Sequence, residues 1–110
     1  MRLPNADRAD LGEKLEQYVL NPDHRLGQHK AHVFESVLGI TLANRDVLAD
    51  AILSAARASD QAEPRGDNGH GELYVLRFPL QTPTGAATLL TAWIIRHGED
   101  FPRLTTCYII

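Results

Sequence analysis

The sequence predicts an α+β fold in which three N-terminal helices pack on one face of a C-terminal antiparallel β-sheet. Apolar residues recur at helical spacing as far as residue 58 and at strand spacing from residue 72 onward. Turn-like segments separate the strands, and helices followed by a run of hairpin-connected strands are typical of the α+β class. The length of 110 residues suggests one domain, residues 1–110, with a single core.

The helices are expected at about residues 10–20, 28–38 and 44–58. Pro22 ends the first, because a proline disfavours helical angles in the residue before it. Gly39 is a plausible C-cap for the second. The apolar residues expected to face the core are Leu11, Leu15 and Val19; Val33, Phe34, Val37 and Leu38; and Val47, Leu48, Ala51, Ile52 and Ala55.

The C-terminal half is expected to form the sheet. Residues 59–71 hold three glycines and one proline, which predicts a mobile surface loop. Strands follow at 72–80, 86–97 and 103–110. The middle strand is apolar on both faces, as expected at the centre of a sheet, so Trp93 is interpreted as a core residue. One face of the sheet should pack on the helices, and the other is either shielded or used.

Composition limits the possible functions. The net charge of -3 argues against a general nucleic-acid coat protein but leaves room for a local positive patch. A single cysteine, Cys107, excludes an internal disulfide and a cysteine zinc cluster. The N-terminus lacks the apolar core of a signal peptide, and no apolar run approaches the roughly 20 residues that span a membrane. We therefore expect a cytoplasmic protein that does not contact a membrane.

The start of the second helix carries an unusual group of imidazoles and cations: His24, Arg25, His29, Lys30 and His32. At about 100° per residue, Lys30 falls almost on the midline of the buried stripe, His29 lies on its flank and His32 points to water. Two interpretations of Lys30 are open. Its aliphatic stem covers the edge of the core, or its ammonium meets an anion in a cleft, aided by the free N–H groups of the helix terminus.

The histidines are candidates for proton transfer near neutral pH. His24 and His29 are the better ones, because both lie beside the positive helix terminus. A zinc site from His29 and His32 lacks a third ligand at a convincing spacing, and no carboxylate motif for a metal is present. We therefore expect no metal and no cofactor.

The last strand ends in alternating hydroxyl residues. Thr106 and Tyr108 are expected to share one face with Leu104 and Ile110, whereas Cys107 lies on the other face with Thr105 and Ile109. Threonine and tyrosine are good strand formers, so this pattern is compatible with a purely structural role. They are also hydroxyl donors that can hold a phosphate oxygen.

Two segments resemble a family of small, uncharacterised bacterial domains that occur alone and at the C-termini of polymorphic toxins. These segments are "NPDHRLGQHKAHVFESVLG" and "PRLTTCY", and the resemblance extends from about Leu15 to Tyr108. That family is in turn similar to the superfamily of metal-independent ribonucleases that includes barnase, EndoU, colicin-type tRNases and RelE. The resemblance implies the BECR-like fold of that superfamily.

The resemblance also implies a metal-independent endoribonuclease that leaves a 2′,3′-cyclic phosphate and a 5′-hydroxyl. The expected partners are RNA, with tRNA as one candidate, and a cognate immunity protein or antitoxin. The expected place of action is the cytoplasm or, for a delivered toxin domain, the cytoplasm of a target cell. The residues expected to act are the acid–base candidates His29 and His24, the phosphate-neutralising Lys30, the phosphate-orienting Thr106 and Tyr108, and the substrate-binding Arg25 and Arg103. The alternative, which the acidic net charge favours, is a catalytically inactive binding or regulatory module of the same fold. A nuclease or phosphotransferase with a different substrate is also open.

Overall fold

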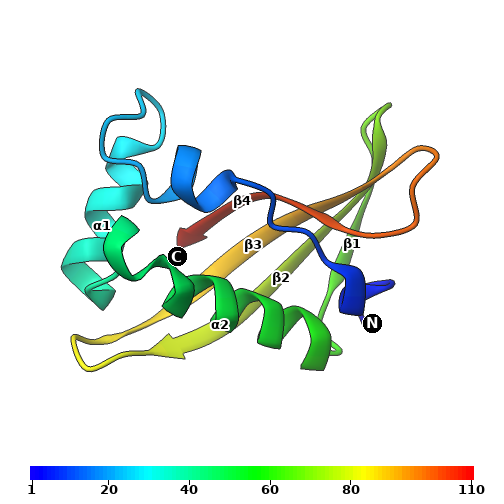
Figure 1. The fold of residues 1–110 in the computed structure, drawn as a ribbon. Coiled ribbons are helices and arrows are strands. Elements are labelled where there is room, and N and C mark those ends of the chain that lie inside the picture. Colours follow the sequence, from blue (N-terminus) through cyan, green and yellow to red (C-terminus); the bar gives the residue numbers. More distant parts are fainter.

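Helices and short helical turns precede a four-stranded antiparallel sheet in the chain (Figure 1). The structure is a computed structural model that describes residues 1–110. The sheet has the simple order β1-β2-β3-β4, so consecutive strands are neighbours. Neither α-helix combines the length and apolar character that crossing a bilayer requires. The elements are η1 (Ala6–Arg8), η2 (Leu15–Val19), α1 (Gln28–Leu38), η3 (Leu42–Asn44), α2 (Arg45–Ala58), β1 (Glu63–Asp67), β2 (Gly71–Gln81), β3 (Ala86–Arg96) and β4 (Arg103–Ile109).

The predicted fold of three helices on one face of the sheet is wrong, because the first expected helix does not form. Residues 10–20 instead contain η2, a single π-helical turn of five residues. Its wide turn is closed by a hydrogen bond of 2.9 Å from the Leu20 N–H to the Leu15 carbonyl. Leu15, Val19 and Leu20 are all buried. A π turn brings residues four and five positions apart onto one side, which an α-helix cannot do equally well.

The predicted mobile loop at residues 59–71 is also wrong in part, because it contains the edge strand β1. Glu63 pairs with Val75 and Pro64 with Tyr74, and the register shifts between Pro64 and Asp67. A proline and a bulge are tolerated at a sheet edge, where one side of the backbone has no partner. All five residues of β1 are exposed, so the sequence shows no alternation of apolar and polar residues there.

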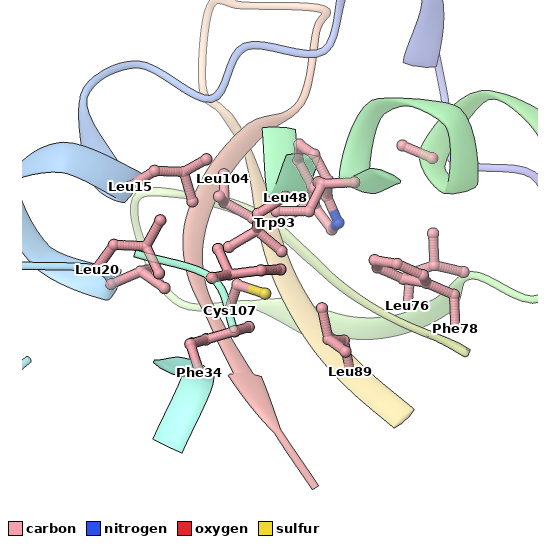
Figure 2. Close-up of a cluster of buried hydrophobic side chains, with 14 of the residues drawn as sticks. Leu15, Leu20, Phe34, Leu48, Leu76, Phe78, Leu89, Trp93, Leu104 and Cys107 are labelled. Atoms are coloured by element: carbon pink, nitrogen blue, oxygen red, sulfur yellow. The ribbon is translucent and has the colours of Figure 1, made fainter. Parts of the chain in front are cut away.

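The core lies between the helices and one face of the sheet (Figure 2). α1 packs against β3 and β4, and α2 packs against β2. Phe34, Leu48, Ile52 and Trp93 are completely buried, as predicted, whereas Val37 is only partly buried. Phe34 anchors α1 in this core, and α1 packs over β4, the last strand of the sheet.

Candidate functional site

A pocket of about 890 Å³ lies where η2 and the start of α1 meet the outer edge of β4. Its lining is richer in positive than in negative side chains, although the chain as a whole has a net charge of -3. Such a local excess of one sign attracts oppositely charged ligands. The charged lining residues are the cations Lys14, Lys30, Arg96 and Arg103 and the carboxylates Asp10 and Glu13.

Lys30 reaches into this pocket from the first turn of α1, partly buried between two aromatic rings. Its Nζ donates a hydrogen bond of 2.9 Å to the Tyr18 hydroxyl. The same nitrogen lies 5.0 Å from the Tyr18 ring centroid and 5.9 Å from that of Tyr108. No carboxylate lies within 4.0 Å of it. The ammonium is therefore held by hydroxyl and π-electron contacts, and no carboxylate of the protein competes with a ligand for it.

Tyr18 is the functional candidate that the sequence did not reveal. The π turn of η2 presents its ring to the pocket, and the His24 ring contacts it edge-on at 5.0 Å. Gly27 packs directly on its backbone, because an added Cβ at Gly27 would lie 2.1 Å from the Tyr18 carbonyl oxygen. The hydrogen bond from Lys30, and then the charge of Lys30, hold the pKa of Tyr18 below its ordinary value, although burial opposes the effect. No local motif links the two residues, which are 12 positions apart.

His24 lines the same pocket, but its ring is fixed as a hydrogen-bond donor. Its Nδ1 accepts hydrogen bonds of 3.0 Å from the backbone N–H groups of Leu26 and Gly27. The proton of the neutral imidazole is therefore assigned to Nε2. While these bonds persist, His24 has no free nitrogen that could accept a proton. The expected acid–base role is thus reduced to hydrogen-bond donation.

A β-bulge in β4 turns Thr106 and Tyr108 toward the pocket. Trp93 pairs with Leu104 but Ala92 pairs with Thr106, so Thr105 is an extra residue in the strand. The predicted common face of Leu104, Thr106 and Tyr108 is therefore wrong. Leu104 is buried with Cys107 in the core around Trp93 (Figure 2). Thr106 and Tyr108 are less buried and line the pocket, whose floor Leu104 also touches. A bulge often redirects a side chain in this way beside a functional site.

The hydroxyl of Thr106 is buried and has no hydrogen-bond partner. It lies near the Tyr18 hydroxyl and makes a small contribution to lowering the pKa of Tyr18. No hydrogen bond of ordinary geometry joins the two groups, so we treat Thr106 Oγ1 as unpartnered. A buried polar atom without a partner is costly. It marks the place where a ligand atom would be stabilised.

Over residues 2–110 the sequence matches a protein family described as a domain of unknown function, DUF6883. The chain belongs to the DUF6883 family. No curated protein matches it. The description of the family states no activity, so the relationships to toxins and ribonucleases that we expected from the sequence stay predictions for this DUF6883 domain.

The other predicted site residues of this DUF6883 domain lie outside the pocket or are already paired. His29 and His32 line a different pocket of about 640 Å³, together with Glu35. Arg25 is exposed and lines neither pocket. The structure therefore does not bring His29 or Arg25 together with Lys30. No group of three or more His, Cys, Asp or Glu side chains is arranged to hold a metal ion.

Arg103 also lines the pocket of about 890 Å³ that contains Lys30, hereafter the Lys30 pocket, but its guanidinium is already hydrogen-bonded to carboxylates. It makes two hydrogen bonds to Glu99, of 2.9 and 2.8 Å, and one of 3.2 Å to Asp10. Bidentate pairing of this kind fixes the side chain. Arg103 therefore ties β4 to the N-terminal segment. Lys14, Lys30 and Arg96 are the cations of this pocket without a carboxylate partner, and among them Lys30 is the one bonded to an aromatic hydroxyl. Cys107 is buried, which raises the pKa of its thiol to about 12 and makes it unsuited to nucleophilic attack.

Proposed function

We propose that the Lys30 pocket binds an RNA phosphodiester and cleaves it without a metal ion. The observation that carries the proposal is the pair formed by the Lys30 ammonium and the Thr106 hydroxyl. Lys30 has no carboxylate partner, and the Thr106 hydroxyl has no hydrogen-bond partner. Both residues line a pocket with more positive than negative side chains. An anion with several oxygen atoms satisfies both groups at once, and a phosphodiester is such an anion.

RNA carries its own nucleophile, which suits a pocket equipped mainly with hydrogen-bond donors and cations. The ribose 2′-oxygen attacks the adjacent phosphorus atom, and the 5′-oxygen departs. The products are a 2′,3′-cyclic phosphate and a 5′-hydroxyl. Lys30, Thr106 and the Nε2–H of His24 would stabilise the extra negative charge on the phosphorane. The rings of Tyr18 and Tyr108 offer surfaces for stacking of the flanking bases.

The biological setting follows from the substrate. An RNA substrate, with tRNA as one candidate, implies action in a cytoplasm, either of the producing cell or of a target cell that receives the domain. A nuclease active in its own cytoplasm requires an inhibitory partner, such as an immunity protein or antitoxin. Arrest of growth upon expression without such a partner is therefore expected.

A digest of total RNA with purified protein, with and without EDTA, tests the proposal. We expect cleavage in both, with 2′,3′-cyclic phosphate ends on the products. Lys30→Ala should slow cleavage strongly because the charge that stabilises the phosphorane is lost. His32→Ala is the matched control, because His32 lies on the same helix but outside the pocket.

Two results would decide against cleavage. If no RNA is cut under any condition, the domain is a binding or regulatory module. If EDTA abolishes cleavage, a metal ion takes part and the metal-independent chemistry is wrong.

A further inference from the structure

The Lys30 pocket contains a phenol whose hydrogen-bonding arrangement suits one task in this reaction. We propose that Tyr18 is the general acid that protonates the departing 5′-oxygen, an assignment that rests on the proposed RNA cleavage. Neither sequence motif nor family description points to this residue. The inference comes from the contacts of its hydroxyl group and from the hydrogen bonds already made by His24 and by the two carboxylates of the pocket.

The hydroxyl of Tyr18 is arranged to donate its proton into the pocket. The Lys30 ammonium donates to the phenolic oxygen at 2.9 Å, so one lone pair of that oxygen is occupied. The O–H bond must then point away from Lys30, and the nearby Thr106 hydroxyl makes no hydrogen bond of ordinary geometry with it. After proton transfer, the same ammonium stabilises the phenolate at contact distance. A lowered pKa of Tyr18, caused first by this hydrogen bond, agrees with this arrangement.

The position of the phenol is fixed by packing on two sides. Gly27 lies against the backbone of Tyr18, and the His24 ring meets the phenol ring edge-on with an interplanar angle of 75°. The buried residues Leu15 and Val19 anchor the same π turn in the core. Held in this way, the hydroxyl needs little reorganisation to reach a substrate atom.

His24 and the two carboxylates of the pocket are already hydrogen-bonded within the protein. His24 Nδ1 accepts two backbone hydrogen bonds, and proton loss from Nε2 of a neutral imidazole would create a far stronger base than a phenolate. Asp10 accepts from the Gly12 N–H and from Arg103, and Glu13 accepts from Gln17. Both carboxylates therefore act as hydrogen-bond acceptors within the protein. The neutral acids of the pocket are the phenols of Tyr18 and Tyr108, and Tyr18 is the one whose oxygen accepts a hydrogen bond from Lys30.

In the proposed step water accepts the proton of the 2′-hydroxyl, and Tyr18 supplies the proton of the 5′-oxygen. The 2′-hydroxyl loses its proton to solvent, the 2′-oxygen forms a bond to phosphorus, and the bond from phosphorus to the 5′-oxygen breaks. The 5′-oxygen takes the Tyr18 proton and leaves as a hydroxyl. Tyr18 remains as a phenolate beside Lys30 and regains a proton from solvent before the next cycle.

A substrate in which sulfur replaces the bridging 5′-oxygen tests this role. A thiol ionises far more readily than an alcohol, so a sulfur leaving group departs without a general acid. Tyr18→Phe should slow cleavage of an ordinary dinucleotide substrate by about 10²- to 10⁴-fold. The Tyr18→Phe variant should cleave the sulfur-substituted dinucleotide at close to the rate of the unmodified protein. Tyr74→Phe is the matched control and should cleave both substrates normally, because Tyr74 packs on the core and not in the pocket.

The outcomes separate this inference from the proposed function. Equal slowing on both substrates would overturn the acid role, because a base or a merely structural residue gives that result. Normal cleavage of both substrates by Tyr18→Phe would also overturn it and leave the proposed function intact. If the unmodified protein cleaves neither substrate nor total RNA, the proposed function fails and the role of Tyr18 fails with it.

Discussion

Replacing Gly27 with alanine should damage both the stability of the protein and the Lys30 pocket. The new Cβ would lie 2.1 Å from the Tyr18 carbonyl oxygen and 2.9 Å from its carbonyl carbon. The first distance is about 1.3 Å shorter than the 3.4 Å at which ordinary contact begins. The obstacle is backbone rather than a flexible side chain, so the turn before α1 must move away from η2. Gly27 has a φ of −92°, so the effect is one of space and not of backbone strain.

The expected loss in the free energy of unfolding is about 1–3 kcal/mol, as for other overpacked sites. Urea unfolding followed by the fluorescence of Trp93 measures it, because this single tryptophan is completely buried. Separation of the two segments should also break the 2.9 Å contact between Lys30 and Tyr18 and slow RNA cleavage. Gln28→Ala changes the next, exposed residue and should shift the stability by less than about 0.5 kcal/mol. If Gly27→Ala unfolds at the same urea concentration as the unmodified protein, the packing described for η2 and this turn is wrong.

Three further predictions concern separate contacts. Thr91→Val should lower the free energy of unfolding by about 1–3 kcal/mol, measured by urea unfolding, because the buried Thr91 hydroxyl bonds the Leu76 carbonyl and the Trp93 indole N–H. Lys30→Met should raise the pKa of Tyr18 in an ultraviolet titration of the tyrosines, because the hydrogen bond and charge that lower it are lost; an unchanged titration would contradict the contact. The hydrogen bond from His97 lowers the pKa of Asp67, so the stability it contributes is present above the ordinary pKa of an aspartate and is lost as the pH falls through the lowered value. Asp67→Asn should therefore remove part of the acid-induced loss of stability, and an unchanged acid limb of the stability curve would refute this.

The spacing of apolar residues predicted α1, α2 and the strands β2, β3 and β4, because an element that buries one face must place apolar residues at its own helical or strand period. α1 and α2 each bury one stripe, represented by Phe34 in the first and by Leu48 and Ile52 in the second, and any helix packed on a sheet must do so. β3 is apolar on both faces because it lies between β2 and β4. The same reasoning could not find β1, because an exposed edge strand has no buried face to mark its period.

The site could be predicted only where it depends on such a regular element. Lys30 lies on the midline of the α1 stripe, so helical geometry alone directs it toward the edge of the core, where the structure places it in the pocket. His29 differs from Lys30 by one position, and that step of about 100° carries it to a different pocket. The sequence prediction assigned both to one site because both lie at the start of the helix, although the helix directs them to different faces.

Two irregular elements border the same pocket, and each positions one of its hydroxyl groups. The π turn of η2 presents Tyr18, and the bulge at Thr105 frees Thr106 from the core face of β4. A regular strand that buried Leu104 would also direct Thr106 into the core, because side chains two residues apart share a face. A regular helix at η2 would place Tyr18 differently relative to the buried Leu15 and Val19. The π turn interrupts regular helical geometry and the bulge interrupts regular strand pairing, and each brings a hydroxyl group to the pocket that holds the Lys30 ammonium. Such departures from regular structure are expected at functional sites, and their meeting at the Lys30 ammonium supports this pocket as the place where the domain acts.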